Sequence, residues 1–583
     1  MLVRHPVAAS IVQSLWSSWV LFLAATLPMA TIDVLVLGRQ SIADLFYWDQ
    51  DVVVIVAMTI LIRLLQFDFP RGWTGPAARL PASWRSIGAL SITIGLAAYA
   101  GTFLVLENYP LSVDEFMASF DAQIVRHGRL AAAVPPAWKD YVPALQPMLL
   151  MPVPDDRFWM SSYLPVNAAF RGLFAWLGSE QAAGPVWAAL SIVAIYGVGT
   201  RLWPNRRDLA LIATLLLATS SQFVVAAMTP YAMPAHLALN LLWLWLVMTD
   251  RRWSHALAMV VAFLACGLHQ LVFNLLFAAP FVLQLWLDRR WKPALAHTLA
   301  YAAISLFWIF YWTLLFHQIG VAGDHAAATA GAPGSGNALA QFMAHIARLV
   351  GAFNVSALPL MAENLTRFAA WQNILTVPLL LLAVRPAAAA AGPYRNLLLG
   401  IVLTLLLVTV VIPYQDHGWG FRYLHGLLGS ACLLAAWCWG RLTKGLEAAQ
   451  RDRACGLLTV AMAASAALIP IHAWQANRFT RPYAQAQRAI EATPADVVLV
   501  DSHGVLYGMD LVRNDPWLQR GPLVMELSQL GADQVRTLCR TRKVSVFSGP
   551  MALSYGIRPL NSLSGKKYAI PVRPLTTEQV CGG

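Results

Sequence analysis

The stretch LENYPLSVDEFMASFDAQIVRHGRL, residues 106–130, directly follows an apolar run and opens the first long polar segment of the chain. Pro110 ends the apolar run, and Ser112 followed by Glu115 has the S-x-x-E spacing of a helix capping box. Gly128 is a natural end for such a helix. The spacing therefore predicts one short helix that begins with an acidic pair.

The predicted helix has two unlike faces. Phe116, Phe120 and Ile124 lie along one face, whereas Asp114 and Asp121 lie along another. A helix of this kind rests flat on a membrane surface, with its apolar face toward the lipid. We therefore expect its carboxylates at the level of the outer lipid headgroups.

The remainder of the chain has the composition of a membrane protein. Of its 583 residues 58% are hydrophobic and 12% are charged, with a mean hydropathy of +0.57. Soluble domains are roughly 45–50% apolar and 25% charged. Apolar stretches of the length that crosses a bilayer, about 20 residues, recur from Ile11 to Trp474. The fold class is thus an α-helical polytopic membrane protein, and a soluble enzyme with one anchor is excluded.

Thirteen spans are predicted, and the first is interpreted as an uncleaved span because its apolar run is too long for a signal peptide and no clear cleavage site follows it. The spans lie near residues 11–37, 50–67, 86–106, 183–200, 208–228, 232–249, 254–269, 270–287, 295–316, 372–391, 396–413, 421–440 and 455–474.

Basic residues alternate between the predicted loops, which indicates the orientation in the membrane. They cluster after every second span, at Arg63, Arg71, Arg79 and Arg85, Arg201, Arg206 and Arg207, Arg251 and Arg252, Arg289, Arg290 and Lys292, Arg385 and Arg395, and Arg441, Lys444, Arg451 and Arg453. The intervening connections 228–232, 269–270 and 414–420 contain no Lys or Arg. Short basic loops face the cytoplasm. The protein is therefore predicted to lie in a bacterial inner membrane with its N-terminus on the cytoplasmic side. The net charge of +12 is then a topology signal, and no nucleic acid is expected as a partner.

The predicted domains follow from this orientation. Residues 1–477 form the transmembrane domain, with outer loops 107–182 and 317–371, and residues 478–583 form a small periplasmic α/β domain. In the latter, ADVVLVDSHG and KVSVFSG predict strands and GADQVRTLCRTRK predicts a helix. Cys539 and Cys581 are the two cysteines of this outer tail, where an oxidising compartment favours a disulfide between them.

An acidic side chain at the outer headgroup level suits one particular chemistry. A hydroxyl acceptor that attacks a sugar linked to a membrane-embedded polyprenyl phosphate needs a base for its proton, and cations to hold the departing phosphate. Asp114 is the candidate base, and Glu115 beside it is a candidate for binding the substrate or its phosphate. The alternative is structural, because Glu115 serves as a helix cap and Asp114 favours the positive end of the helix dipole.

The D-E pair after an outward-going span, followed by the small-residue step at Ala122 and a G-x-L end at Gly128, Arg129 and Leu130, resembles the first periplasmic loop of GT-C fold glycosyltransferases. The most similar are of the bacterial aminoarabinose transferase and protein O-mannosyltransferase type. The resemblance implies a polyprenyl-phosphate sugar donor and Asp114 as the catalytic carboxylate. The acceptor would be an extracytoplasmic lipid, glycan or protein, and direct in-line attack would invert the anomeric carbon.

The chain also departs from this family. Two spans precede the one that leads into the motif, whereas one is usual. The second outer connection, 229–235, carries no acidic residue, which puts a divalent metal ion in doubt and leaves no cofactor certain. Asp155 and Asp156 in the first outer loop could bind such an ion, or could be a solvated pair.

A second polar segment, PYQDHGWGFRYLHG at residues 413–426, joins the eleventh and twelfth predicted spans. Ionisable groups between apolar helices indicate function by default. Arg422 can hold a phosphate through its fork of donors, with His417 and Tyr423 as further binding candidates. The alternative is an arginine that reaches the interface beside aromatic residues.

Four further residues are candidates for binding phosphate or sugar. His236 and His269 lie at outer span ends, where a histidine also commonly serves as a hydrogen-bonding group between helices. Arg126 and Arg129 close the surface helix and could bind lipid phosphate, although a favourable interaction with the helix dipole explains them equally well.

Two other functions compete with transfer. A secondary transporter or flippase of lipid-linked or glycan intermediates would place ionisable residues and broken helices near the bilayer midplane, whereas the acidic residues here concentrate in outer loops. A non-catalytic assembly factor would need no base at Asp114. The Gly- and Ala-rich part of loop 317–371 is either a lid over a site or an ordinary mobile loop.

Overall fold

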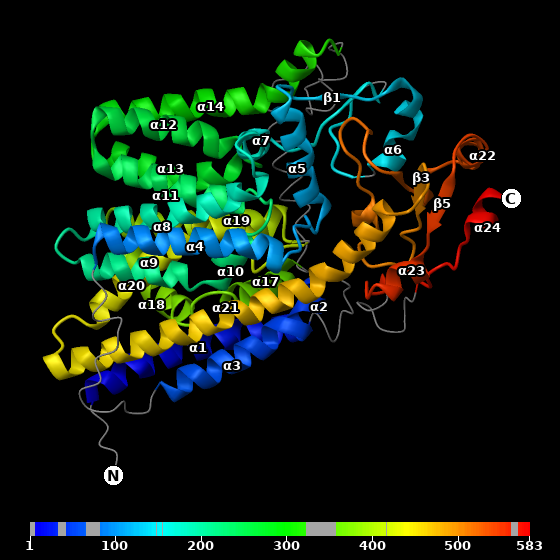
Figure 1. Ribbon diagram of the computed structural model, residues 1–583. Helices are drawn as coiled ribbons and strands as arrows, with labels where there is room; N and C mark the ends of the chain where they lie inside the picture. The colour runs from blue at the N-terminus through cyan, green and yellow to red at the C-terminus, as the bar shows by residue number, and fades with distance from the viewer. Residues whose placement is uncertain are drawn as a thin grey trace.

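The computed structural model describes residues 6–32, 42–65, 82–146, 148–153, 156–321, 357–415, 417–560 and 570–582. The proposed lid within loop 317–371 lies mostly outside these residues, and so does Asp155. Most of the described chain is helical, with a small α/β region at the C-terminus (Figure 1).

The membrane part is a bundle of apolar helices with a few short helical turns between them (Figure 1). Its elements are α1 (Pro6–Ile32), α2 (Ile42–Phe46), the π-helix η2 (Tyr47–Asp51), α3 (Val52–Leu64), α4 (Trp84–Leu104), α8 (Ala183–Leu202), α9 (Arg207–Ala218), α10 (Ser221–Ala226), α11 (Met233–Thr249), α12 (Arg252–Cys266), α13 (Val272–Leu287), α14 (Trp291–Gln318), α17 (Ala357–Ala370), α18 (Thr376–Ala389), α19 (Pro393–Val411), the 3-10 helix η7 (Arg422–Leu427), α20 (Leu428–Leu442) and α21 (Ala448–Glu491).

Two further groups of elements lie outside this bundle. The first follows α4 and comprises α5 (Val113–Arg126), β1 (Ala132–Ala133), η4 (Pro136–Tyr141), α6 (Val142–Leu145), β2 (Phe158–Trp159), α7 (Val166–Trp176) and η6 (Glu180–Ala182). The second, the C-terminal α/β region, comprises β3 (Val497–Val500), η8 (Gly508–Leu511), β4 (Leu523–Glu526), η9 (Leu527–Gln529), α22 (Ala532–Thr541), β5 (Val544–Phe547), α23 (Gly549–Ser554) and α24 (Thr577–Cys581).

The length and hydropathy of the helices make the chain a multi-pass membrane protein. Within the described residues, six helices are long and apolar enough to cross a bilayer, and four shorter apolar helices accompany them. Each predicted span coincides with a helix or with an interrupted helix such as α9 and α10. The number of thirteen crossings itself stays a prediction.

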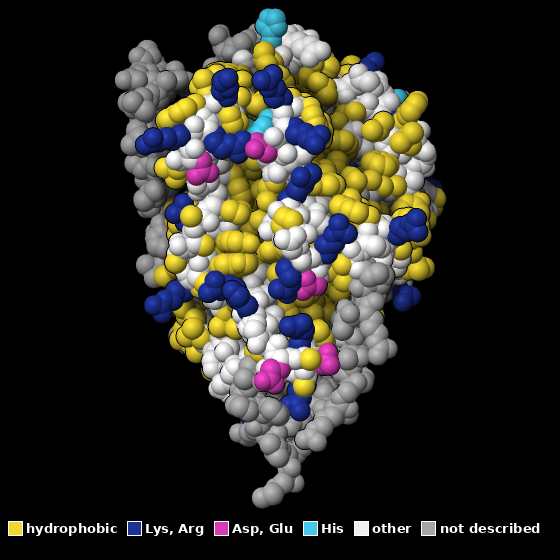
Figure 2. All heavy atoms as spheres, turned by 90° about the vertical axis from the view of Figure 1, so that its left-hand side faces the viewer, with side chains coloured by type: hydrophobic (Ala, Val, Ile, Leu, Met, Phe, Trp, Pro, Cys, Tyr) yellow, Lys and Arg dark blue, Asp and Glu magenta, His cyan; other side chains and the backbone are white. Residues whose placement is uncertain are grey.

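The basic residues of the alternate loops gather on one face of the molecule. Figure 2 shows Lys and Arg side chains spread over the end of the bundle that lies farthest from the C-terminal α/β region. Arg207 begins α9, Arg252 begins α12 and Arg441 lies in the last turn of α20, and all three are exposed there. The basic loops that alternate along the sequence therefore lie together at one end of the bundle.

The first two helices pack against helices that come late in the chain. α1 lies along α17 and α18, and α3 contacts α17, whereas α4 packs on α8. The side chain of Asp51 is buried at this junction and accepts a hydrogen bond from Trp371 Nε1 at 3.1 Å. The two additional N-terminal spans thus belong to the side of the bundle formed by α17, α18 and α21 (Figure 1).

Helix α5 has the predicted faces but a different neighbour on its apolar side. It lies across the ends of the long helices, between them and the C-terminal α/β region (Figure 1). Phe120 and Ile124 are buried in one cluster with Val497 and Leu499 of β3. Protein therefore covers the apolar face, and the expectation that this face rests on lipid is wrong.

The C-terminal α/β region continues from α21 without a break. This helix has 44 residues, a length of roughly 66 Å at 1.5 Å per residue, so it extends well beyond a bilayer of about 30 Å. The three strands are parallel in the order β4-β3-β5. β3 is buried along its whole length, as expected of a strand covered on both faces.

A disulfide joins Cys539 of α22 to Cys581 of α24, with Cα atoms 5.6 Å apart and a sequence separation of 42. Closing a loop of that length stabilises a fold by about 4 kcal/mol. We expect the Cys539→Ser, Cys581→Ser double variant to lose its C-terminal region to limited proteolysis at a lower temperature than the wild type. Cys455→Ser, which removes a free cysteine of α21, is the control. Equal protease resistance with labelling of both thiols in the wild type would contradict the disulfide.

Candidate functional site

The start of α5 is fixed by its own cap. Ser112 Oγ accepts a hydrogen bond from Glu115 N at 3.2 Å, and the Glu115 carboxylate accepts one from Leu111 N at 2.7 Å. Glu115 therefore folds back over the helix start and is buried there. Asp114, one residue earlier, points away from this cap toward the second polar segment.

Burial raises the pKa of the Glu115 carboxyl to about 7 against the opposing hydrogen bond from Leu111. A carboxyl whose pKa is higher in the folded state stabilises the protein fully at a pH below its ordinary pKa, and this stabilisation is lost as the pH rises through 7. We expect the thermal stability of the wild type in detergent to fall between about pH 5 and pH 8, by on the order of 3 kcal/mol. Glu115→Gln, which keeps an acceptor for Leu111 N, should remove most of that slope. An unchanged slope in this variant would contradict the assignment.

Asp114 lies at the centre of a cluster drawn from distant parts of the chain. Its carboxylate is 2.6 Å from Arg422 Nη1 and accepts a hydrogen bond from the Tyr163 hydroxyl. The His269 ring stacks on Tyr163 with ring centroids 4.3 Å apart. Burial is the largest single influence on the pKa of Asp114 and raises it, but the charge of Arg422, the His269 ring and the hydrogen bonds from Tyr163 and Arg422 together outweigh burial and hold that pKa below its ordinary value. Asp114 is therefore ionised at neutral pH.

The loop before η7 aims Arg422 at Asp114. Gly418 and Gly420 have φ values of +130° and +69°, which are accessible mainly to glycine. Gln415 accepts a hydrogen bond from Arg422 N at 2.8 Å and donates one to the Gly420 carbonyl at 2.9 Å. Gln222 of α10 donates to the Phe421 carbonyl at 2.8 Å. The backbone of this loop is thus held from within and from the bundle.

Aromatic rings and buried amides complete the surroundings of Arg422. Its guanidinium carbon lies 5.2 Å from the Tyr231 ring centroid and 5.5 Å from that of Tyr423. Asn240 of α11 donates to the Gly426 carbonyl at 3.0 Å and accepts from Asn274 of α13 at 2.9 Å. Hydrogen bonds between helices in an apolar environment fix their relative position, so η7 is anchored to two helices.

Arg367 of α17 holds the same loop from the side of the N-terminal helices. This fully buried arginine donates to the Gly418 carbonyl, and its guanidinium carbon lies 4.4 Å from the Phe46 ring centroid of α2. The loop that carries Arg422 is therefore in contact, through Arg367, with α2, which lies between the two additional N-terminal spans.

Two small cavities, each of about 20 Å³, flank the Asp114–Arg422 pair. One is lined by Asp114, Asp121, Tyr163 and His269, and the other by residues that include Arg422, Tyr423, His236, Asn240 and Phe273. Five of the residues singled out in the sequence, from four separate segments, thus meet in one place, namely Asp114, His236, His269, Arg422 and Tyr423.

Asp121 is the second carboxylate of this region. It accepts hydrogen bonds from the Ser161 backbone at 3.0 Å and from the Ser161 hydroxyl. Burial raises its pKa to about 6. Both carboxylates on the polar face of α5 therefore face the same small cavity, but only Asp114 has a cationic partner at hydrogen-bonding distance.

Other predicted site residues lie elsewhere. His417 is buried with its Nε2 atom 2.8 Å from an Asp510 carboxylate oxygen of η8 and with its ring against Tyr507. Arg126 and Arg129 are exposed at the far end of α5, roughly 18 Å along the helix from Asp114 at 1.5 Å per residue. Neither of these two arginines joins the Asp114 cluster.

The described residues hold no group of three or more His, Cys, Asp or Glu side chains with the spacing of a metal site. Asp156 is half-buried in the first outer loop and does not line the cavities beside Asp114. The proposed pair with Asp155 is not testable, since Asp155 lies outside the described part of the chain.

Sequence reasoning missed the two tyrosines that surround the ion pair. Tyr163 lies in an irregular part of the first outer loop, and Tyr231 is buried with its hydroxyl 2.9 Å from Ser112 Oγ. The only available signal was their place in segments already predicted to face outward. That signal is shared by too many residues to single them out.

No protein-family model and no curated protein matches the chain. Among solved structures, the chain is similar to ArnT from Cupriavidus metallidurans bound to undecaprenyl phosphate, at 12% identity and a TM-score of 0.49, over 82% of this chain and 97% of that one. It is similar to the oligosaccharyltransferase of Archaeoglobus fulgidus in the apo form, at 11% identity and a TM-score of 0.45, over 76% of this chain and 65% of that one.

A third similar structure is the arabinofuranosyltransferase AftD from Mycobacteria, at 18% identity and a TM-score of 0.37, over 77% of this chain and 33% of that one. All three are glycosyltransferases of the GT-C class, the class that the D-E motif resembles. At these identities and TM-scores the similarity concerns the fold alone, and it assigns neither a donor nor an acceptor to this protein.

Proposed function

We propose that the protein is a membrane glycosyltransferase that moves a sugar from a polyprenyl-phosphate donor to an acceptor on the outer side of a bacterial inner membrane. The observation that carries the proposal is the Asp114–Arg422 pair, a carboxylate and a guanidinium 2.6 Å apart. Asp114 lies in the first turn of the outer helix α5, and Arg422 begins η7, which packs on α11, α19 and α20 of the bundle. A lipid-linked phosphate and a polar acceptor can both reach such a boundary between the outer elements and the bundle.

In the proposed reaction, the acceptor hydroxyl attacks the anomeric carbon of the donor and gives its proton to the Asp114 carboxylate. The bond between that carbon and the phosphate oxygen breaks, and the phosphate leaves with the electron pair. Arg422 neutralises the charge that develops on the phosphate. Because attack and departure lie on opposite faces of the sugar, the configuration at the anomeric carbon inverts.

The two roles require the ion pair to open when donor binds. A phosphate is a bidentate partner for a guanidinium, so it competes with Asp114 for Arg422. Release from Arg422 removes the main influence that lowers the pKa of Asp114. The carboxylate then becomes a better base only in the presence of the donor.

The orientation in the membrane is part of the proposal. The basic ends of the helices face away from the C-terminal α/β region (Figure 2), and basic loops favour the cytoplasm. The Asp114 cluster and the C-terminal α/β region then lie on the periplasmic side, where a disulfide is favoured.

A transporter or flippase is the second candidate, because α9 and α10 are interrupted at Thr219 and polar residues cross-link that break to Gln372 and Asn373. The two functions differ in their products. Purified protein in liposomes, supplied with a radiolabelled polyprenyl-phosphate sugar and an envelope lipid extract as acceptor, should release polyprenyl phosphate and label the acceptor. Movement of intact donor across the bilayer without any release of phosphate would support the transporter and reject the transferase.

A further inference from the structure

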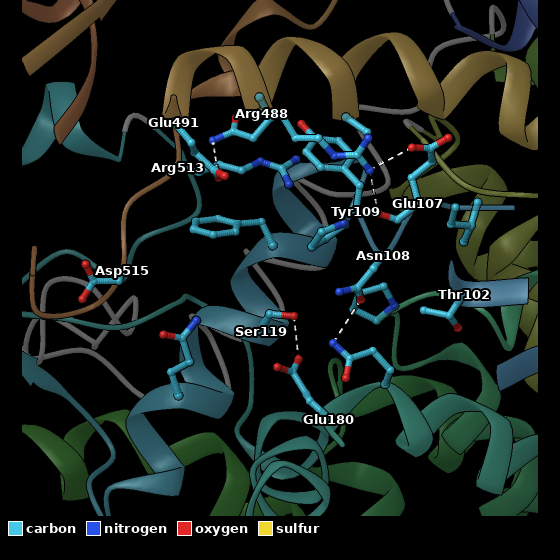
Figure 3. Close-up of a pocket in the computed structure, with 18 of the residues that line it drawn as sticks. Thr102, Glu107, Asn108, Tyr109, Ser119, Glu180, Arg488, Glu491, Arg513 and Asp515 are labelled. Carbon is cyan, nitrogen blue, oxygen red and sulfur yellow. Dashed lines mark hydrogen bonds and ion pairs between the residues drawn. The ribbon is translucent and has the colours of Figure 1, made fainter. Parts of the chain in front are cut away.

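A cavity of about 610 Å³ lies beside α5 (Figure 3), and its lining does not include Asp114. Helix α5 turns Phe116, Ser119 and Gln123 into it, whereas Asp114 and Asp121 face the small cavity beside Arg422. These two sets of positions are half a helical turn apart. The other walls come from α21, the C-terminal α/β region, the end of α4 with the segment that follows it, α7, η6 and the segment before α11.

The charges around this cavity balance. Its lining holds four arginines and four carboxylates, namely Arg171, Arg488, Arg513 and Arg520, and Glu107, Glu180, Glu491 and Asp515. Two of these pairs already neutralise each other, because Arg171 lies 2.6 Å from Glu180 and Arg488 lies 2.8 Å from Glu107. Neither a phosphate nor a metal cation therefore finds a surplus of opposite charge, and a neutral polar ligand fits better.

Two buried polar atoms of the lining have no hydrogen-bond partner among the described residues. They are the Tyr109 hydroxyl and the Gln487 Oε1 atom, in side chains that are 8% and 4% exposed. Buried polar groups are nearly always paired. A ligand that both donates and accepts hydrogen bonds would satisfy the hydroxyl and the amide oxygen together.

The remaining lining combines flat rings with amides. The Phe116 side chain lines the cavity, and so do the side chains of Asn108, Gln123 and Gln181, which carry amides. Sugars expose C–H groups on the faces of their rings and hydroxyls at the edges, so they pack on aromatic side chains and bond to amides and carboxylates.

We propose that this cavity is a binding site for a neutral saccharide, with room for roughly two or three sugar rings at this volume. The site itself does not depend on the proposed function. Only the role of the bound saccharide, which is to hold the distal part of a glycan-bearing acceptor, rests on that function. The acceptor class would then be a glycan and not a simple lipid.

The test is saturation-transfer NMR on the purified full-length protein in detergent. The probes are maltotriose, mannotriose, cellotriose, arabinotriose and N,N′-diacetylchitobiose, with inorganic phosphate added as an anionic competitor. We expect saturable binding of at least one oligosaccharide, and phosphate should not displace it. Binding of no oligosaccharide, or displacement of the bound oligosaccharide by phosphate, would overturn the proposal.

Two variants locate the binding. Gln123→Trp fills the cavity without removing any side-chain hydrogen bond found in the described residues, and it should weaken saccharide binding by tenfold or more, roughly the loss of one or two hydrogen bonds. Tyr109→Phe removes only the hydroxyl and should weaken it by roughly five- to tenfold. Gln485→Trp, at a half-exposed position of α21 outside the lining, is the matched control and should bind as the wild type does.

Failure of this site and failure of the proposed function are distinguishable. Asp114→Asn should bind the oligosaccharide with wild-type affinity, because Asp114 faces the other side of α5. Equal binding by the wild type and Gln123→Trp would overturn the saccharide site and leave the transferase proposal unaffected. Loss of transfer in Asp114→Asn with intact saccharide binding would support both proposals.

Discussion

Replacing Asp114 by asparagine is expected to lower the rate of sugar transfer by about 1,000-fold or more, which is within the range that a positioned general base contributes. Asparagine is close to isosteric and can still accept a hydrogen bond from Arg422, so the local geometry is retained. It cannot take the proton of the acceptor hydroxyl. The measurement is release of polyprenyl phosphate from a radiolabelled donor in liposomes.

Asp121→Asn is the matched control for this variant. Asp121 lines the same small cavity from the same face of α5, but its partners are the backbone and hydroxyl of Ser161. Its replacement should change the rate by less than about tenfold, because no proton transfer in the reaction depends on it. Full activity in Asp114→Asn, or loss of activity in Asp121→Asn, would show that the assignment of the base to Asp114 is wrong. Both variants must keep the wild-type elution volume in detergent.

Replacing Arg422 by glutamine is expected to lower kcat/KM for the donor by about 100- to 1,000-fold, as for the loss of one group that stabilises developing charge. Arg422→Lys should recover part of this, since an ammonium keeps the charge but cannot bind a phosphate in the bidentate geometry. Residual activity of Arg422→Gln should also depend differently on pH. Without Arg422, burial raises the pKa of Asp114, so the acidic limb of the rate profile should move to higher pH.

The pH profile separates a functional from a structural role for Arg422. Variants that merely unfold lose activity at every pH, whereas loss of the ion pair shifts the limb of the profile that reports the base. Arg536→Gln, which removes an exposed arginine of α22 paired with Asp533, is the charge-matched control and should behave as the wild type. An unshifted limb in Arg422→Gln would show that Arg422 does not control Asp114.

Residue chemistry made both members of the pair predictable, but their contact was not. Asp114 and Arg422 stand out because ionisable groups beside apolar helices are costly. They are separated by 308 positions in the chain, and neither periodicity nor charge pattern indicates which outer segments meet. That information lies in the packing of α11 and α13 against η7.

The faces of α5 were predictable for the same reason, whereas its surroundings were not. Helical spacing places Phe116 and Phe120 together whether lipid or protein covers them. In the structure, the apolar side of β3 takes the place that a membrane surface would have had. Strand β4 was missed because its four residues form a short apolar run that periodicity cannot distinguish from other buried segments.

The C-terminal α/β region contacts both segments that carry the Asp114–Arg422 pair. His417, in the loop that leads to Arg422, lies against Asp510. Arg513 donates to the Leu111 carbonyl at 3.0 Å, immediately before the cap of α5. In the proposed orientation, residues beyond 500 cross the membrane last, whereas Asp114 crosses it early in synthesis. The growing chain therefore has no completed site until its C-terminal region has been translocated, so the order of synthesis delays any chemistry until the whole chain is made.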